Sequence, residues 1–367
     1  MKEIYKVASY IAVFLAVFFL PTGAEWLLTS LQSSLELLNE YAREHVLTCL
    51  LPALFIAGGL ASLVRKQEIL KYLGDKTSKI KSYLIASTSG ILLAVCSCTI
   101  LPLFASIRRN GAGLGPASTF LLAGPAINIA AIMLTISVLG VEIGIARMIA
   151  AIIIAVLVGL TMSYFFKEEF ESNKFHLARQ NTYEPLRKAL PLFLLLITIL
   201  IVTSIDMPLI IMYSLLGIII ISIIGMTLTL KKESKDKWLE ETWSFSKLIL
   251  PLLFIGIFIV GFITPLIPDG LIENIAGENT VQGNFISGLF GVLMYFSTLT
   301  EIPILQTLIN EGMHKGPALT LLLAGPSVSL PNMLVIRSIL GNKKTLTYIA
   351  LTLIYSTIAG LTYGFLF

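Results

Sequence analysis

Long apolar stretches recur along this chain of 367 residues. The segment Ile210–Leu230 holds no charged residue, and its length reaches the roughly 20 residues that span the hydrocarbon core of a bilayer. Only 13% of the residues are charged and 56% are hydrophobic, which leaves too little charge to cover a water-soluble domain. The pattern predicts an all-α, polytopic transmembrane protein. The other segments that carry this prediction are Ile11–Leu20, Ile149–Phe166, Leu190–Val202 and Thr345–Phe367.

The first apolar run has features of a signal peptide, because Lys2 and Lys6 precede it. No clean A-x-A cleavage site appears after Pro21, so we expect this run to stay in the protein as a first helix. The net charge of +4 is small, and the basic residues lie between apolar spans. We therefore expect the lipid bilayer, and not nucleic acid, as the macromolecular environment.

An internal repeat divides the chain. Pro102–Pro125 aligns without gaps with Pro303–Pro326 at an offset of 201, and 11 of the 24 positions are identical. Chance similarity between apolar segments would match Leu and Ile, but it would not match Gly-Pro pairs twice. About residues 45–165 thus repeat as 245–366. We predict an N-terminal repeat at 1–166, a cytoplasmic linker at 167–188 and a C-terminal repeat at 189–367.

The basic residues predict how the repeats are oriented. If every apolar segment crossed the membrane, 12 Lys and Arg would lie inside and 14 outside, against the positive-inside rule. If 83–107 and 284–309 are re-entrant hairpins, 23 of the 26 lie inside. This second topology has a cytoplasmic N-terminus, nine full spans and two hairpins that enter from opposite sides, so the repeats are inverted. Its three basic residues on the outer side are Arg43, Arg147 and Lys315.

The first hairpin carries two thiols, Cys96 and Cys98, at its tip. In an extended stretch residues i and i+2 share one side, whereas in a helix they point apart. Pro102 disfavours a helix at the residue before it, which supports an extended tip. Paired thiolates select soft, thiophilic species, although each cysteine could also be a small packing residue. We expect substrate to contact the tip at Cys96, Ser97, Cys98 and Thr99.

The second hairpin replaces the thiols with hydroxyls and a carboxylate. Glu301 is the acidic residue that we place within the apolar depth, where carboxylates are costly and commonly functional. We predict that Glu301 carries protons, with Ser297 and Thr300 beside the substrate. Two alternatives stay open: Glu301 lies nearer the outer surface, or it accepts hydrogen bonds from free backbone amides.

Matching breaks follow both hairpins. Gly124-Pro125 and Gly325-Pro326 interrupt apolar segments, and Asn128 and Ser329 stand just beyond them. Broken helices expose carbonyls and amides that can bind a polar solute. We expect these residues to line the pathway, with packing kinks as the alternative.

Other chemistry has little support. His45, His176 and His314 form no ligand cluster, and no phosphate loop, Ser/His/Asp set or paired-cysteine zinc motif is present. We expect no resident metal, no cofactor and no enzymatic activity. Cys49 has no motif that places it with the other two cysteines.

The stretch from Cys96 to Asn128 resembles the ArsP-type predicted permease family. Its Cys-Ser-Cys-Thr-Ile-Leu-Pro motif is followed by Gly-Leu-Gly-Pro-Ala-Ser-Thr-Phe-Leu-Leu-Ala-Gly-Pro-Ala-Ile-Asn, and the resemblance covers nearly the whole chain. It implies export of trivalent organoarsenicals such as methylarsenite, with thiols in recognition. Carried over to this sequence, those thiols are Cys96 and Cys98.

The function expected is thus ion-coupled efflux of a thiophilic compound across the cell membrane. A permease for another soft or sulfur-containing solute is an alternative, and so is a non-transporting membrane subunit. A membrane thiol redox enzyme is a weaker alternative, since a disulfide between residues i and i+2 is strained. Homo-oligomer formation is left open.

Overall fold

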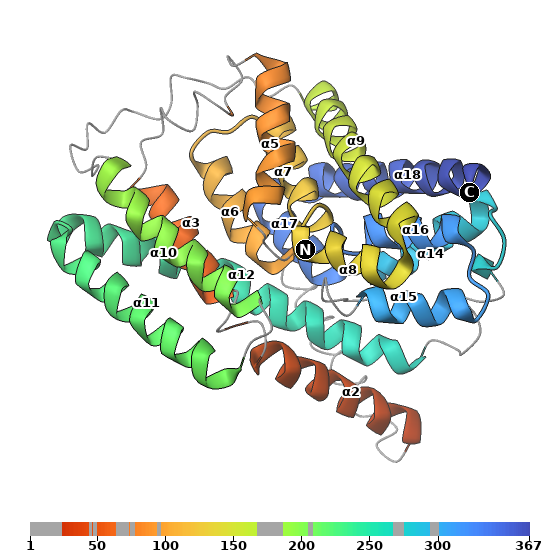
Figure 1. Cartoon of the computed structure of the whole chain (residues 1–367), viewed down its shortest axis with the longest axis horizontal. Helices are drawn as coiled ribbons and strands as arrows, with labels where there is room; N and C mark the ends of the chain where they lie inside the picture. The colour runs from red at the N-terminus through yellow and green to blue at the C-terminus, as the bar shows by residue number, and fades with distance from the viewer. Residues whose placement is uncertain are drawn as a thin grey trace, which may run out of the picture.

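In the computed structural model, residues 24–43, 46, 50–63, 73, 78–93, 97–166, 186–204, 208–266, 275–293 and 301–367 are described. This part of the chain is helical and contains no strand (Figure 1). Its helices are α2 Glu25–Tyr41, α3 Leu51–Ser62, α5 Lys79–Leu93, α6 Ser97–Arg109, α7 Leu114–Ala126, α8 Ile129–Leu139, α9 Val141–Phe165, α10 Leu186–Ser204, α11 Leu209–Thr229, α12 Lys232–Ile263 with the 3₁₀ turn η2 Thr264–Leu266, α14 Val281–Leu293, α15 Glu301–Asn310, α16 Lys315–Ala324, α17 Leu330–Leu340 and α18 Asn342–Leu366.

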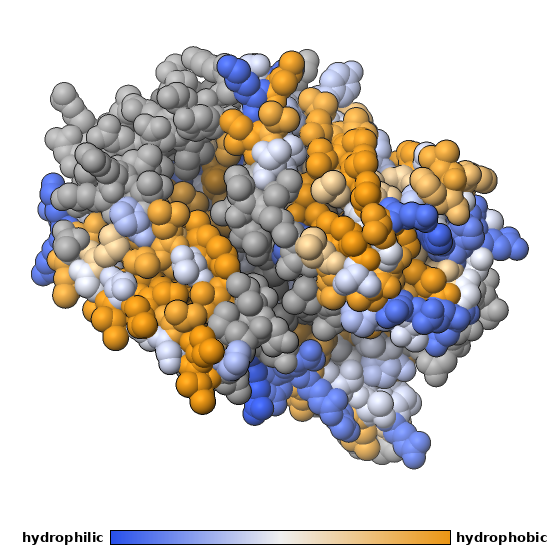
Figure 2. Space-filling view, viewed as in Figure 1, coloured by the Kyte–Doolittle hydropathy of each residue, from blue (hydrophilic) through white to orange (hydrophobic). Residues whose placement is uncertain are grey.

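Four of the described helices, α9, α11, α12 and α18, are long and apolar enough to cross a membrane. A fifth span is possible if α7 and α8, which are bent by 46° at their junction, count as one. The predicted nine full spans are not confirmed by length and composition. The apolar side chains of α11 and α9 form broad hydrophobic areas on the surface (Figure 2), and only 6% of the apolar window of α11 is buried. The chain is therefore a helical membrane protein with several spans.

The sequence repeat has a structural counterpart. Helices α8 and α17, and likewise α9 and α18, begin and end at residues that differ by 201. The turns that follow α6 and α15 place Gly111 at φ 94° and Gly312 at φ 111°, where only glycine is free of strain. The same offset thus relates helices, breaks and turns, so the two halves share one plan.

Glycines bring the helices of each half into close contact. A Cβ added to Gly159 of α9 would lie 2.6 Å from the carbonyl oxygen of Gly115 on α7. In the second half, a Cβ on Gly360 would lie 2.6 Å from the carbonyl oxygen of Gly316. The repeated glycines are therefore required where α9 crosses α7 and where α18 crosses α16.

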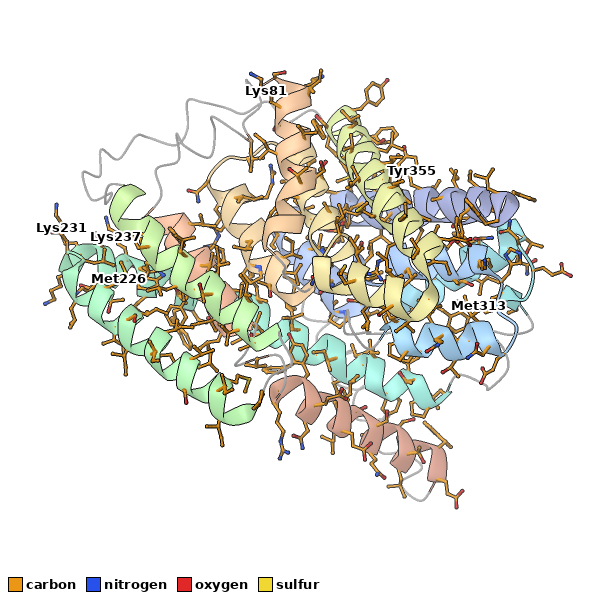
Figure 3. All side chains as sticks on the ribbon, viewed as in Figure 1. Lys81, Met226, Lys231, Lys237, Met313 and Tyr355 are labelled. Carbon is orange, nitrogen blue, oxygen red and sulfur yellow. The ribbon has the colours of Figure 1, made fainter. Side chains whose placement is uncertain are left out.

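The two halves exchange contacts reciprocally. Helix α6 of the first half packs on α17 of the second, and the equivalent helix α15 packs on α8 of the first. Helices α9 and α18, which are equivalent to each other, also pack together, with Tyr355 between them (Figure 3). The hydroxyl of Tyr355 lies 2.9 Å from that of Thr161 on α9. Such reciprocal packing is the pattern that a two-fold relation between similar units produces.

Helix α12 connects the peripheral helices to this assembly. It packs on α2, α3, α6 and α17. Trp238 of α12 donates its indole N–H to the carbonyl oxygen of Phe55 at 2.8 Å, and a Cβ added to Gly58 of α3 would collide with the side chain and backbone of Thr242. Leu51-Pro52 of α3 matches Leu250-Pro251 of α12 at the slightly shorter offset of 199, and Trp238 and Thr242 precede that matching segment.

Candidate functional site

Glu301 is buried at the first residue of α15. The residue is 1% exposed, and Ile302 and Leu305 of the same helix are equally enclosed. A Cβ added to Gly325, at the end of α16, would stand 3.2 Å from Oε1 of Glu301. Glycine at this position thus lets the carboxyl group lie against the break between α16 and α17. Glu301 is therefore enclosed by the protein.

The first half has the same packing with different chemistry. Ile100 is the equivalent of Glu301, and a Cβ on Gly124 would collide with the Ile100 side chain. One half therefore presents an apolar group to its break, while the other half presents a carboxyl group. This asymmetry agrees with the difference that the two hairpin tips show in sequence.

Arg147 is the charged partner of Glu301. It lies two turns into α9, and its Nη2 is 3.6 Å from Oε2 of Glu301, with both side chains 0% exposed. Its Nη1 donates to the hydroxyl oxygen of Thr135 on α8 at 3.0 Å, and that hydroxyl donates to the carbonyl oxygen of Ala131 at 2.6 Å. A buried ion pair therefore joins the first half to the second.

The topology derived from sequence misplaced Arg147. The basic-residue count assigned it to the outer side, together with Lys315, but the structure buries it inside a 25-residue apolar helix. Its isolation among apolar residues was the available signal, because a lone ionisable residue in such a segment commonly faces a partner or a cavity. Nothing in the sequence named Glu301 as that partner, since the two residues are 154 positions apart.

The ion pair is poorly hydrogen-bonded. Within the described part of the chain, Nε and Nη2 of Arg147 and both carboxyl oxygens of Glu301 have no hydrogen-bond partner. A distance of 3.6 Å is also longer than the 2.7–2.9 Å of a charge-assisted hydrogen bond. The expected alternative, in which backbone amides hold Glu301, is therefore not seen among these residues.

The thiol site is only partly described. Cys96 lies outside the described residues, and of Ser97 and Cys98 only the backbone is described, as the first two residues of α6. Pro102 was expected to disfavour helix before it, yet it lies inside α6, and the extended backbone expected at the tip is not found at Ser97 and Cys98, which are helical. Because a proline has no N–H, Pro102 cannot donate the helical hydrogen bond to the carbonyl oxygen four residues earlier, which is that of Cys98. Thr99 is buried.

The helix breaks lie where the sequence predicts them. Gly124 and Pro125 belong to the last turn of α7, and the chain bends before α8 begins. Gly325 caps α16, and Pro326 follows it in the turn. Asn128 and Ser329, directly before α8 and α17, are 7% and 2% exposed. The structure thus buries both polar residues at the breaks, together with Asn332 one turn into α17.

The remaining residues singled out in the sequence are either not described or have a structural role. Ser297, Thr300, Cys49, His45 and His176 lie outside the described residues. His314 caps α16 by accepting a hydrogen bond from the amide of Gly316 at 3.2 Å, which is a structural role. In the described ranges no group of three His, Cys, Asp or Glu side chains could hold a metal ion.

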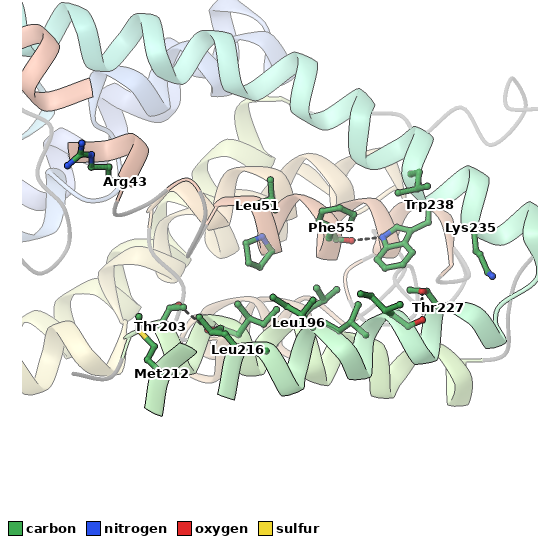
Figure 4. Close-up of a pocket in the computed structure, with 17 residues that line it drawn as sticks. Arg43, Leu51, Phe55, Leu196, Thr203, Met212, Leu216, Thr227, Lys235 and Trp238 are labelled. Atoms are coloured by element: carbon green, nitrogen blue, oxygen red, sulfur yellow. Dashed lines mark hydrogen bonds between the residues drawn. The ribbon is translucent and has the colours of Figure 1, made fainter. Parts of the chain in front are cut away.

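A separate apolar cavity of about 790 Å³ opens between α3, α10, α11 and α12 (Figure 4). Leu196, Leu216 and Phe55 are among its walls, and Arg43 and Lys235 lie at opposite ends. None of the site residues predicted from sequence lines it. The cavity lies beside α11, whose apolar window is the least buried of the four candidate spans.

Known proteins resemble this chain over most of its length. A family model described as predicted permease matches residues 32–365. A UPF0718 protein of Methanocaldococcus jannaschii is 42% identical over 340 residues, which cover 89% of this chain and 93% of that protein. The UPF0718 protein YraQ of Escherichia coli K12 is 22% identical over 278 residues, or 75% of this chain and 65% of that protein. No solved structure matches. This helical membrane protein, with its broken helices and buried ion pair, therefore belongs to the predicted permease family.

Proposed function

We propose that this protein is a permease of the cell membrane that exports a thiophilic small compound, with trivalent organoarsenicals such as methylarsenite as the substrate class. The main observation in support of transport is the buried Arg147–Glu301 pair, which lies between the two repeated halves of a permease-family protein. Ionisable groups at such depth in a helical membrane protein mark substrate or ion pathways. The thiophilic substrate rests on Cys96 and Cys98 and on the family resemblance of their motif.

The two halves, 1–166 and 189–367, are proposed to be inverted repeats joined by a cytoplasmic linker at 167–188, with a cytoplasmic N-terminus. Reciprocal packing of α6 on α17 and of α15 on α8 supports a two-fold relation. Helices α5 and α6, and likewise α14 and α15, are the arms of the proposed re-entrant hairpins. In inverted-repeat transporters the broken segments meet near the midplane of the bilayer.

Two exposed ion pairs agree with this topology. Arg109 of α6 pairs with Glu241 of α12 at 3.2 Å, and the proposal places both residues on the cytoplasmic side. Lys315 of α16 pairs with Glu142 of α9 at 3.3 Å, and it places both on the outer side. A topology that put the members of either pair on opposite sides would conflict with these contacts.

Accessibility labelling tests the inversion. In a chain whose native cysteines are replaced by serine, cysteines introduced at Arg108 and Lys315 are expected to react with a membrane-impermeant maleimide from opposite sides of the membrane. Permeabilised cells, in which both positions should react, are the control. Labelling of both positions from one side would rule out inverted repeats.

The proposed mechanism divides two tasks between the hairpin tips. Cys96 and Cys98 bind arsenic as thiolates, and Ser97, Thr99, Ser297 and Thr300 surround the substrate. The residues at the helix breaks line the rest of the pathway: Gly124, Pro125, Asn128, Gly325, Pro326 and Ser329. Binding by thiolates releases protons, because the deprotonated sulfur is the ligand. Glu301 carries a proton in exchange, since removal from water favours the neutral acid over the carboxylate.

Transport into everted membrane vesicles tests both tasks. Cys96→Ser and Cys98→Ser are each expected to abolish methylarsenite uptake, because one thiolate cannot chelate arsenic as two do. Glu301→Gln is expected to bind methylarsenite but to lose the response to an imposed pH gradient, because an amide carries no proton. Cys49→Ser is the matched control and should transport normally at equal expression.

The outcomes separate the candidates. Full methylarsenite uptake in the Cys96→Ser/Cys98→Ser double variant would remove the thiols from the mechanism. A normal pH response in Glu301→Gln would remove Glu301. An absence of uptake of any arsenical by the native chain would favour a permease for another soft or sulfur-containing solute, or the non-transporting membrane subunit.

A further inference from the structure

The guanidinium of Arg147 presents an unused edge. Its Nη1 is taken by the Thr135 hydroxyl, while Nε and Nη2 have no hydrogen-bond partner among the described residues. Nε–H and one Nη2–H point the same way from the planar group and form the fork that binds two oxygens of one anion. Glu301 lies beside this edge, but its nearest approach is 3.6 Å at Nη2. The Nε and Nη2 groups thus lie near the Glu301 carboxylate but form no hydrogen bond with it.

Protonation of Glu301 changes the charge balance of this site. While Glu301 is ionised, the buried pair is neutral overall. A guanidinium does not lose its proton in proteins, so a proton on Glu301 leaves Arg147 as an uncompensated buried cation. Such a charge is strongly unfavourable in an apolar interior, and an anion that reaches the free fork restores neutrality.

Among the described helices around the pair, no other charge supplies this compensation. Helix α8 carries no titratable residue over Ile129–Leu139, and on α15 the titratable group is Glu301 itself. Tyr348 of α18 is buried, but a neutral phenol does not balance a cation. The remaining charged side chains of α5, α9, α16 and α18 lie at the helix ends: Lys79, Lys81, Glu142, Lys315, Lys343 and Lys344.

We infer that Arg147 is a proton-dependent receptor for a small monovalent oxyanion, which takes the place of the Glu301 carboxylate at the Nε and Nη2 edge. Binding of the anion leaves the net charge of the site unchanged. One proton binds to Glu301 and one anion binds to Arg147, so the buried site is neutral before and after. Thr135 keeps the guanidinium in position through Nη1 in both states. This site goes beyond the proposed function, since it does not depend on the thiols or on arsenic.

Thermal unfolding of the purified protein in detergent tests the site, with nitrate or formate as the probe and gluconate at equal ionic strength as the reference. Glu301→Gln imitates the protonated state. We expect nitrate to raise its Tm at neutral pH, because a ligand that binds only the folded state stabilises it. The native chain should show this gain only at acidic pH. The Arg147→Met/Glu301→Gln double variant, which has no buried cation, should show none at either pH.

The comparison also distinguishes the source of any effect. An equal gain from nitrate in the single and double variants would be a general salt effect and would overturn the inference. If Glu301→Gln does not fold, the native chain at acidic pH against the double variant gives the same test, with an apparent Kd at least about tenfold weaker in the double variant. No arsenical or gradient is present, so failure here leaves the proposed transport function untouched, and failure of transport leaves this site untouched.

Discussion

Glu301→Gln is expected to destabilise the protein by about 3–5 kcal/mol, because it leaves the Arg147 cation buried without its carboxylate. Arg147→Met removes the other partner and should cost a similar amount near neutral pH. The two variants should differ as the pH falls. The carboxyl group left in Arg147→Met can take up a proton and become neutral, so its penalty should shrink, whereas the guanidinium left in Glu301→Gln keeps its charge. Thermal unfolding in detergent, in gluconate and across a pH series, measures both.

Two controls show whether the ion pair itself is responsible. The Arg147→Met/Glu301→Gln double variant has no buried charge and should recover most of the stability lost in the single variants. Lys315→Ala, which breaks the exposed pair with Glu142, should change stability by about 1 kcal/mol or less. Losses that simply add in the double variant would mean that Arg147 and Glu301 do not act as a pair.

Gly360→Ala is expected to destabilise the protein by about 2 kcal/mol or more, and Gly159→Ala by a similar amount. Each added methyl group would meet a backbone carbonyl oxygen of the helix it crosses, at 2.6 Å, and a backbone cannot move aside as a flexible side chain can. The melting temperature in detergent and the fraction of protein that elutes as a folded species check the expectation.

Gly217→Ala is the matched control for these variants. It lies inside α11, and nothing stands within 4 Å of an added Cβ. In a helix, alanine is favoured over glycine by about 0.5–1 kcal/mol, so this variant should be as stable as the native protein or slightly more stable. A loss at Gly217 as large as that at Gly360 would show that close packing is not the cause.

Much of the architecture was predictable because it depends on local pattern. Apolar length predicted the helices α9, α11 and α18, and the offset of 201 predicted the matching breaks after Gly124-Pro125 and Gly325-Pro326. The behaviour of Pro102 was not predictable. A proline disfavours but does not forbid helix before it, and packing of α6 on α3 and α7 outweighs that local preference.

The site was harder to predict than the fold because its key contact is long-range. Glu301 could be singled out as a carboxyl group in an apolar segment, yet its partner comes from α9 in the other half. Counting basic residues treats each Lys and Arg as exposed to water, so the count could not recognise one that a carboxylate holds inside the protein. A lone charge in an apolar helix is the pattern that identifies Arg147, but this pattern does not identify the residue with which Arg147 pairs.

The packing of α3 on α12 has a consequence for biosynthesis. Residues 63–231 are translated between the two helices, so α3 emerges from the ribosome long before the helix that covers it. Until then the carbonyl oxygen of Phe55 lacks the Trp238 indole, and the groove at Gly58 lacks the Thr242 backbone that fills it. The N-terminal half therefore stays incompletely packed in the membrane until α12 is synthesised. The fold of the N-terminal half is then completed by contacts with the C-terminal half.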